Sequence, residues 1–351
     1  GNITLVSSYK GKKSIVKNKI SLIKDVKNPM KVSTSIPSFI KKDGDEFIIP
    51  SGEWVIDDDL LLNGNLTIYP GTEIKFLKDV SMIIKGRINA IGEENKKIIF
   101  NSVNEKWNGL YIFEASQASN LSNVIFKNTT SINEGILNLT GGIVFYKSPV
   151  NMRNITFINS QGEDALNIIE TTYKIENVEF IDAISDAFDS DYASGTISNI
   201  KFKDIGGDAL DFSGSNVIVN NMTGLRIKDK AISVGEKSSI NISDIDLKQV
   251  GVGVASKDGS LASVENCKIE DPLVAGLMTY VKKKNYTSPT LKASNCNIKF
   301  NIFSKLNDQE KKDRKYFRQT GSTLKVDNIK SIPAKLLNVD LLYQTTVMKK
   351  N

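Results

Sequence analysis

The sequence predicts an all-β solenoid, a fold built from stacked coils of short strands. Two columns of residues, which recur with the same period, carry this prediction. A small residue stands inside an apolar phrase about every 22 residues, at Ala165, Ala187, Ala209, Ala231, Gly253 and Gly276. An Asn stands before an apolar strand at Asn123, Asn154, Asn177, Asn199, Asn221, Asn266 and Asn295, with Asp244 in the same place in one further copy. A fixed period of this length is typical of coils that contact only their neighbours.

The Asn column indicates a corner at which the chain turns once per coil. Asn tolerates a left-handed backbone, and its amide can bond to the Asn of the next coil. A stack of this kind would satisfy polar groups that are costly to bury without a partner.

The chain divides into three parts. Residues 1–45 carry Lys, Ser and Asn with weak periodicity, and we expect a leader that caps the open end of the solenoid. Residues 46–300 hold short β-branched runs cut by Gly, Pro and Asn, which predict the strands of the solenoid. Residues 301–351 are expected to form a C-terminal loop and cap, with the charged stretch 304–320 as a solvated loop or short helix.

Composition excludes several kinds of site. The chain has no His, so a His-ligated zinc site and a Ser-His-Asp triad are excluded, and proton transfer falls to carboxylates, Lys, Arg or Tyr. The net charge of +6 is unevenly placed, with an acidic stretch before residue 211 and a basic one after residue 226, which does not form a stripe for nucleic acid. No apolar run reaches the length of a membrane helix. Oligomeric state is left open.

Cys267 and Cys296 occupy the same place in the Asn-marked coils. We expect an inward-facing apolar pair of thiols, which is the commoner environment of free Cys. A disulfide between stacked strands is the alternative, and it would need favourable geometry. Cysteine content therefore leaves the cellular compartment open.

Residues 47–300 resemble the right-handed parallel β-helix of the pectate-lyase-like superfamily, on the phrase LTIYPGTEIKF, the Asn column and the coil length. The longer phrases EDALNI, SDAFDSD, GDALDFSGS, DKAISVGE, ASKDGS and YVKK also resemble exported bacterial β-helix proteins sometimes classed near the CotH kinase-like proteins. This resemblance implies a secreted, periplasmic or cell-surface protein and no particular activity, because one fold hosts many chemistries.

The repeat phrases predict a trough on the outside of the solenoid. Successive strand residues point to opposite faces. If the larger residues Leu166, Phe188, Leu210, Ile232, Val254 and Leu277 face inward, the small column faces outward and forms the floor. The walls would then carry Asp164, Asp186, Asp208 and Lys230 on one side and Asn167, Asp189, Asp211 and Ser233 on the other, with Asp191, Ser213, Glu236, Lys257, Asp258, Tyr280 and Lys282 further out.

Stacked carboxylates need neutralisation, because unit charges about 4.8 Å apart repel by roughly 1 kcal/mol even in water. We expect Asp164, Asp186, Asp189, Asp208 and Asp211 to bind a metal, with calcium as the candidate because its ligands are oxygens from several coils. The alternative is that these Asp residues cap strands and pair with Lys230 and Arg226.

The resemblance to the pectate-lyase-like superfamily implies a reaction. Calcium-dependent pectate lyases hold the metal with Asp residues on consecutive coils, and a Lys or Arg removes the proton next to a uronate carboxyl; Lys230 resembles that base. Arg226, Lys257 and Tyr280 would assist, and Asn167, Asp191, Ser213, Ser233, Glu236, Asp258 and Lys282 would contact substrate. Neighbouring carboxylates raise the pKa of a Lys, which handicaps Lys230 as a base. The β-helix polygalacturonases are a poorer match, since they also use a His.

Two functions follow as hypotheses. The first is an extracytoplasmic enzyme that cleaves an acidic polysaccharide by β-elimination. The second is a non-catalytic β-helix that binds a glycan or a surface protein along the trough, as a module of a cell-surface assembly. A spacer role would leave the trough without a purpose.

Overall fold

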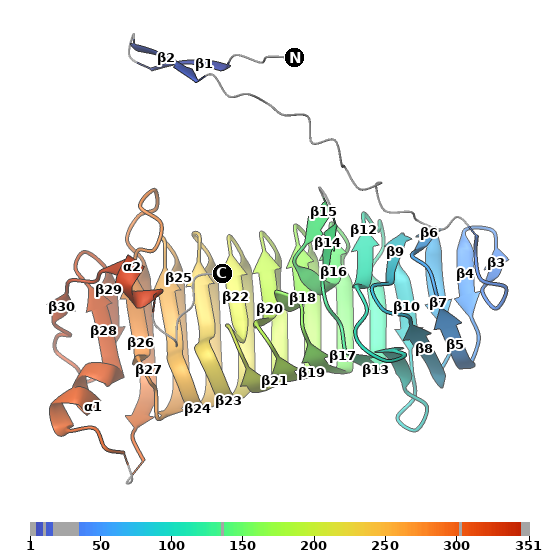
Figure 1. Ribbon diagram of the computed structural model, residues 1–351. Coiled ribbons are helices and arrows are strands. Elements are labelled where there is room, and N and C mark those ends of the chain that lie inside the picture. Colours follow the sequence, from blue (N-terminus) through green and yellow to red (C-terminus); the bar gives the residue numbers. More distant parts are fainter. Residues whose placement is uncertain (1–4, 10–11, 17–34, 135–136, 302–303, 345–351) are drawn as a thin grey trace.

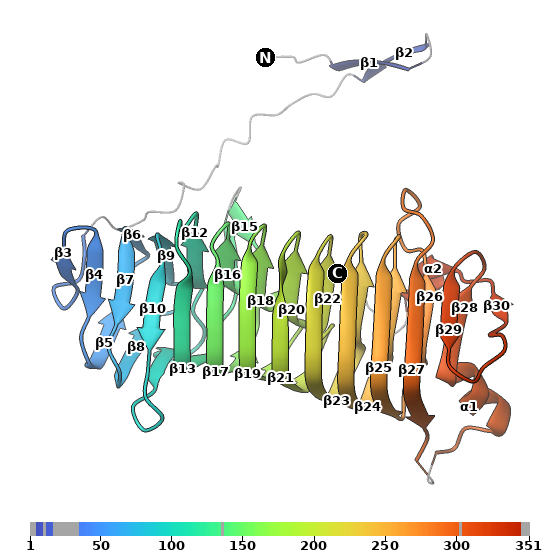
Figure 2. The same cartoon turned by 180° about the vertical axis from the view of Figure 1, so that it is seen from behind.

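In the computed structural model the chain forms a right-handed parallel β-helix of about 10 turns (Figure 1, Figure 2). The structure describes residues 5–9, 12–16, 35–134, 137–301 and 304–344. Residues 17–34 of the predicted N-terminal cap therefore lie outside the described residues. None of the helices within the described ranges is long and apolar enough to cross a membrane.

Each coil adds a segment to three parallel ladders. The first two ladders begin with separate short strands: β4 (Glu46–Ile49), β7 (Asn65–Ile68) and β10 (Ile88–Ile91) in one, and β5 (Gly52–Ile56), β8 (Thr72–Phe76) and β11 (Ile98–Ser102) in the other. Both then continue along the two halves of long strands: β13 (Ser119–Lys127), β17 (Val150–Ser160), β19 (Thr172–Ala183), β21 (Ser194–Ile205), β23 (Asn216–Gly235), β24 (Ser239–Lys257), β25 (Leu261–Glu270) and β27 (Thr290–Lys299).

The third ladder carries the candidate site. Its strands are β6 (Leu60–Asn63), β9 (Ser81–Lys85), β12 (Gly109–Phe113), β16 (Gly141–Tyr146), β18 (Asp164–Ile169), β20 (Asp186–Asp191), β22 (Leu210–Ser213), the ends of β23 and β24, β26 (Ala275–Tyr280), β28 (Tyr316–Gln319) and β30 (Ala334–Lys335).

The remaining elements are β1 (Leu5–Tyr9), β2 (Lys12–Val16), β3 (Lys41–Asp43), β14 (Ile132–Glu134), β15 (Leu137–Leu139), β29 (Thr323–Val326), α1 (Asp308–Lys315) and α2 (Val339–Leu342). Among the residues that the structure describes, β1 and β2 pair only with each other, and β29 extends the first ladder. Parallel pairing continues past residue 300, because β28 pairs with β26 and β29 with β27. The stack is thus longer than the predicted 46–300 range, and the charged stretch 304–320 contains helix α1 as an insertion.

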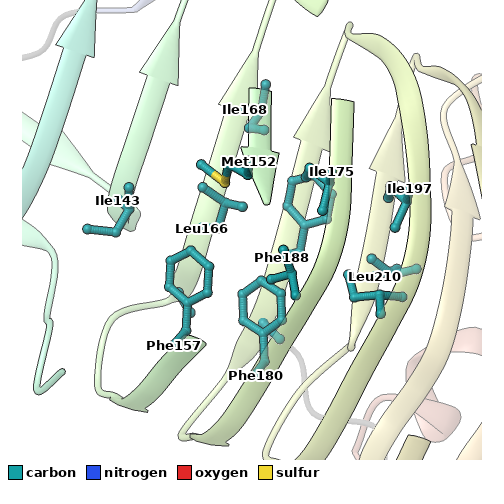
Figure 3. Packing of buried hydrophobic residues seen from close by; sticks show 14 of the residues in the cluster. Ile143, Met152, Phe157, Leu166, Ile168, Ile175, Phe180, Phe188, Ile197 and Leu210 are labelled. Carbon is teal, nitrogen blue, oxygen red and sulfur yellow. The ribbon is translucent and has the colours of Figure 1, made fainter. Parts of the chain in front are cut away.

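The core is a column of apolar side chains that repeats with the coils (Figure 3). The predicted inward residues Leu166, Phe188 and Leu210 are fully buried, as that prediction required. Next to them the rings of Phe157 and Phe180 lie parallel, with centroids 4.5 Å apart. Burying such a side chain contributes about 1.5–3 kcal/mol, so the repeated column supplies much of the driving force for stacking.

The Asn column is confirmed as a ladder at a corner. All eight of its members have positive φ, between 50° and 57°. Hydrogen bonds join neighbouring coils: the Nδ2 of Asn177 donates to Oδ1 of Asn154 over 2.6 Å, and that of Asn221 donates to Oδ1 of Asn199 over 2.6 Å. These side chains are exposed or half-buried, so the ladder stabilises the surface of the corner and does not rescue buried polar groups.

Cys267 and Cys296 form a disulfide, so the predicted pair of thiols is wrong. The two residues are register partners on β25 and β27, and their Cα atoms are 4.4 Å apart. Parallel stacking brings both Cβ atoms to one side of the sheet, and this distance is compatible with a bridge.

The small-residue column does not form the floor of an outward trough. Ala165, Ala187, Ala209 and Ala231 are fully buried members of the apolar core. A Cβ placed on Gly253 would lie 2.6 Å from Cδ1 of the core residue Ile269. Each coil bends at this position, and the small residue faces inward together with the large residue that follows it. The column is small because the bend leaves no room for a larger side chain.

Candidate functional site

The outer face of the third ladder is open only along part of its length. At one end, Ile132 of β14 packs on Tyr111 and Val144, so the excursion that contains β14 and β15 covers β12 and β16. At the other end, Tyr343, which follows α2, packs on Met278 and Tyr280 of β26. The strands between these covers are β18, β20, β22 and the end of β23 (Figure 1). These are the strands that carry the acidic residues.

A pocket of about 280 Å³ opens on this face. We call it the Asp–Lys pocket. Its charged and aromatic lining comprises Asp186, Asp208, Asp211, Lys228, Asp229, Lys230, Lys257, Lys282 and Tyr343, and the rest of its wall comprises Ile184, Ser185, Gly206 and Gly207. Four predicted residues, Asp186, Asp208, Asp211 and Lys230, therefore meet here with Lys257 and Lys282 from later coils. The structure brings together six predicted residues, but around a pocket and not along a trough.

The carboxylates at the start of the coils cap the next coil. Oδ1 of Asp186 accepts the backbone N–H of Asp208 over 2.7 Å, and Oδ1 of Asp208 accepts the backbone N–H of Lys230 over 2.8 Å. Gly207 makes the close approach feasible, because a Cβ there would lie 1.9 Å from Oδ1 of Asp186. The capping role that we considered as an alternative is therefore real for these two residues.

Lys230 is a fixed cation. Its Nζ lies 2.9 Å from Oδ1 of Asp208 and 2.7 Å from Oδ1 of Asp229, and the residue is 2% exposed. Burial alone would lower the pKa of Lys230, but Asp208 and Asp229 outweigh it and hold the pKa well above its ordinary value. A lysine that stays protonated can hold an anion but cannot take up a proton.

Lys257 is the second fixed cation. Its Nζ lies 3.5 Å from Oδ1 of Asp211, which stands two coils earlier. Burial would lower the pKa of Lys257, but Asp211 raises it above the ordinary value. In return, Lys257 and then Lys230 outweigh the effect of burial on Asp211 and lower the pKa of that carboxyl. Asp211 is therefore ionised at neutral pH.

Lys282 differs from Lys230 and Lys257. It makes no ion pair with a carboxylate among the described residues, and its Nζ lies 4.6 Å from the ring centroid of Tyr343. Burial, Lys257 and Lys230 together lower its pKa. Its backbone N–H donates to Oδ1 of Asp258 over 2.7 Å, which fixes the chain at this point. Lys282 is thus the lysine of the pocket whose pKa is lowered.

Tyr280 lies behind the pocket and not in it. It is fully buried, and its hydroxyl lies 2.6 Å from that of Tyr343. Burial, followed by the neighbouring Tyr343, raises the pKa of Tyr280, so the predicted part in proton transfer at neutral pH is disfavoured. Arg226 is also remote: it pairs with Asp204 at another corner, with Nε 2.5 Å from Oδ1, and it does not line the pocket.

Acidic groups outnumber the lysines on this face. Burial raises the pKa of Asp164 to about 7, of Asp229 to about 7 and of Asp191 to about 6. Burial, with further contributions from the other carboxylates, also raises the pKa of Asp186 and of Asp189. These groups hold protons or a cation more readily than ordinary carboxyls.

Three carboxylates could hold a metal ion. Asp186, Asp208 and Asp211 each offer an oxygen within 4.8 Å of the other two, and theirs is the only such group of His, Cys, Asp or Glu in the described part of the chain. Asp164 and Asp189, which we also predicted as ligands, do not belong to this group. Two of its members already contact Lys230 or Lys257, so a metal would share them with an ammonium group.

The other predicted substrate contacts lie beside the pocket. Asn167, Asp189, Asp211 and Ser233 are register partners on four successive coils, as predicted. Asn167 and Ser233 are buried, however, so they are not free to contact a ligand. Ser213 donates to Oε2 of Glu236 over 3.0 Å, and Oε1 of Glu236 contacts Nζ of Lys283. Asp258 holds the backbone of the loop after β26.

Sequence reasoning missed three of the charged and aromatic residues of the pocket. Asp229 could have been found, because it directly precedes Lys230 and so reaches the same coil end. Lys228 stands one residue earlier. Tyr343 had no local signal, since it comes from the C-terminal cap, 63 residues after its hydroxyl partner Tyr280.

Comparison with known proteins assigns no family. No family model matches the chain, and no curated protein matches it. The resemblance to the CotH kinase-like group is therefore unsupported.

Among solved structures the chain is similar to β-helix proteins at low identity. An alginate lyase from Paenibacillus sp. str. FPU-7 is 10% identical, with 78% of this chain and 99% of that chain covered and a TM-score of 0.34. The periplasmic alginate epimerase AlgG is 9% identical, with 83% and 80% covered and a TM-score of 0.34. The catalytic domain of a GH87 α-1,3-glucanase is 14% identical, with 84% and 64% covered and a TM-score of 0.37. At this distance none of them assigns an activity to this chain.

Proposed function

We propose that this protein cleaves an acidic polysaccharide by β-elimination in the Asp–Lys pocket. The observation that carries the proposal is the pairing of two kinds of lysine in one pocket. Lys230 and Lys257 are held as cations by carboxylates, whereas Lys282 has no carboxylate partner among the described residues and a lowered pKa. An anion-binding charge next to an amine that can accept a proton is what elimination from a uronate needs.

The proposed reaction uses each group once. Lys230 and Lys257 lie where a uronate carboxylate would be attracted, and they stabilise the negative charge that develops when the proton beside that carboxyl is removed. Lys282 takes this proton from C5, the C–H electron pair forms the C4–C5 double bond, and the bond from C4 to the glycosidic oxygen breaks. The leaving oxygen takes a proton from Asp229, whose pKa of about 7 leaves part of it protonated at neutral pH. We assign the base to Lys282 in place of Lys230, because the latter is doubly paired.

Calcium is proposed at Asp186, Asp208 and Asp211. The donors are all oxygens, which suits a hard cation, and the three carboxylates lie close enough to share one. A bound calcium ion would supply further positive charge toward a uronate. Calcium should raise the melting temperature of chelator-treated protein, and Asp186→Asn should remove that rise, while Asp204→Asn at the remote corner should leave it.

We also propose that the protein is located outside the cytoplasm. The Cys267–Cys296 disulfide supports it, because such bonds persist in oxidising compartments. Secreted, periplasmic and cell-surface locations share this property.

Binding without catalysis is the second candidate, with a glycan or a surface protein as the ligand. The observation that favours it is that Lys230 and Lys257 are already neutralised and that Tyr343 covers one side of the pocket. Such a protein would hold its ligand and release no product.

A panel of uronate-containing polysaccharides separates these two functions. We expect the wild type to generate unsaturated ends, seen as new absorbance, from one polymer of the panel. Lys282→Gln should abolish turnover while binding of the polymer changes little, because a general base acts mainly in the transition state. Lys292→Gln, on the exposed surface of β27, is the matched control and should retain activity. Binding by the wild type without any product would favour the second candidate. If the wild type shows neither binding nor product, both glycan functions are ruled out.

A further inference from the structure

A second hollow lies at the C-terminal end of the β-helix, between the end of β27 and helix α1. Its volume is about 570 Å³, and it is lined by Asn297, Ile298, Lys299, Phe300, Asp308, Lys311, Lys312 and Lys315. We call it the basic hollow. Four lysines face one aspartate here, whereas the Asp–Lys pocket is lined by four aspartates and four lysines. In both views α1 and α2 lie at opposite edges of the stack, so the two hollows are separate (Figure 1, Figure 2).

The lysines of the basic hollow have no ion-pair partner among the described residues. Some surface lysines of the coils do, as in Lys75 with Glu53, where Nζ and Oε2 are 2.9 Å apart, and Lys268 with Asp246, where Nζ and Oδ2 are 2.8 Å apart. None of Lys299, Lys311, Lys312 and Lys315 makes an ion pair with a carboxylate of the described residues. Like charges gathered around one concavity repel each other, and an anion that enters it relieves the repulsion.

Helix α1 accounts for some of these charges but not for their arrangement. Lys312 and Lys315 stand in its last turn, where cations stabilise a helix dipole, and its first turn is closed by a capping box of Asn307 and Glu310. Lys299 is outside the helix, at the end of β27, and the dipole gives no reason for it to share a hollow with Lys311. The helix buries no residue, so its face toward the hollow is not held there by apolar packing.

The wall of the hollow is partly apolar. Ile298 is buried beneath it and Phe300 is half-buried at its side. A site with apolar walls and cations at its rim suits a ligand whose rings offer C–H surface and whose substituents are anionic. A carboxylated sugar chain has both properties, whereas a small inorganic anion has only the charge.

We propose that the basic hollow is a non-catalytic binding site for a carboxylated polysaccharide. It would hold the polymer at a point apart from the Asp–Lys pocket and so raise the concentration of chain near that pocket. The site does not depend on the reaction proposed there, since a β-helix that only binds glycan could use it equally.

The test combines calorimetry with hydrogen exchange on the full chain. The probe is a size-defined oligouronate, compared with linear polyphosphate of matched charge and with sodium phosphate. We expect the oligouronate to slow amide exchange in residues 308–315 and the double variant Lys299→Glu/Lys312→Glu to weaken its binding there by about tenfold or more. The control Lys292→Glu/Lys325→Glu changes the net charge by the same amount on the exposed surface of β27 and β29, outside the hollow, and should weaken it far less. Added salt should weaken the binding, because the lysines are exposed to solvent or nearly so.

Three results would overturn the proposal. Residues 308–315 could remain unprotected by the oligouronate; the control variant could lose as much affinity as the hollow variant, which would show a diffuse charge effect; or phosphate or polyphosphate could protect 308–315 where the oligouronate does not, which would assign the hollow to phosphate groups. Protection of residues 206–211 is read in the same experiment and reports the Asp–Lys pocket, so failure of one site is distinguishable from failure of the other.

Discussion

Replacing Asp164 with Asn should make the protein less sensitive to alkaline pH. Asp164 is 3% exposed and its Oδ2 is 3.4 Å from Nδ2 of Asn167, with no lysine ion pair among the described residues. Burial raises the pKa of this carboxyl from 3.8 to about 7. The folded chain therefore binds this proton more strongly than the unfolded chain, and the free energy of unfolding falls as pH rises from about 4 to about 7.

The pKa difference sets the size of the effect. The pKa of Asp164 differs by roughly three units between the folded and the unfolded chain. At about 1.4 kcal/mol per unit, ionising this carboxyl lowers the free energy of unfolding by up to about 4 kcal/mol. About 2.5 kcal/mol of this falls between pH 5 and pH 8, because the unfolded carboxyl is already ionised at pH 5 while the folded one is still protonated. Asn carries no charge at either pH and has nearly the same shape.

Urea unfolding followed by circular dichroism at pH 5 and pH 8 measures this effect. Between pH 5 and pH 8 the free energy of unfolding of the wild type should fall by about 2.5 kcal/mol more than that of Asp164→Asn. The denaturant slopes of the two proteins should be equal. Asp182→Asn, at an exposed corner, is the control and should behave as the wild type does. Parallel losses in wild type and Asp164→Asn would refute the reasoning, because they would show that Asp164 is ionised in the folded protein at pH 5.

Two further predictions test the fold. Leu210→Ala, in the fully buried inward column, should lower the free energy of unfolding by about 2–5 kcal/mol, as measured by urea unfolding, and the exposed Ile218→Ala on the same coil should change it much less. Asn199→Ala should cost about 1–2 kcal/mol, because Ala tolerates a backbone φ of 54° less well than Asn and because the hydrogen bond from Asn221 is lost. Asn199→Gly should recover the backbone part of that loss. Equal stability of the Ala and Gly variants would contradict the left-handed corner.

Periodicity was enough to predict the stack and the residues that share a column. The inward ladder of Leu166 and Leu210 and the Asn corner both follow from spacing, because each coil repeats the environment of the one before. Spacing does not reveal how many consecutive residues face inward at a bend. The column that contains Ala187 was therefore predicted in the right register but on the wrong face.

Local sequence was a weaker guide to the partners of charged residues. Asp208 and Lys230 were expected near each other because they occupy the same place on successive coils, and they do pair. Lys257 reaches across two coils to Asp211, and Tyr343 arrives from the C-terminal cap, so neither contact follows from the repeat. The pKa of Lys282 is lowered by burial and then by Lys257 and Lys230, whereas Asp208 and Asp229 raise that of Lys230. The repeat does not show these surroundings, so it pointed to Lys230 as the base.

The central claim, that the Asp–Lys pocket breaks a polysaccharide by elimination, is tested most directly by mass spectrometry of products formed in ¹⁸O-labelled water. Elimination breaks the bond from C4 to oxygen and forms a double bond without adding water, so we predict a product pair with one unsaturated end and no ¹⁸O from cleavage. The Lys282→Gln protein should give no such product. Incorporation of ¹⁸O at a new reducing end would show hydrolysis and contradict the account, and so would unsaturated product that persists at the wild-type rate in Lys282→Gln.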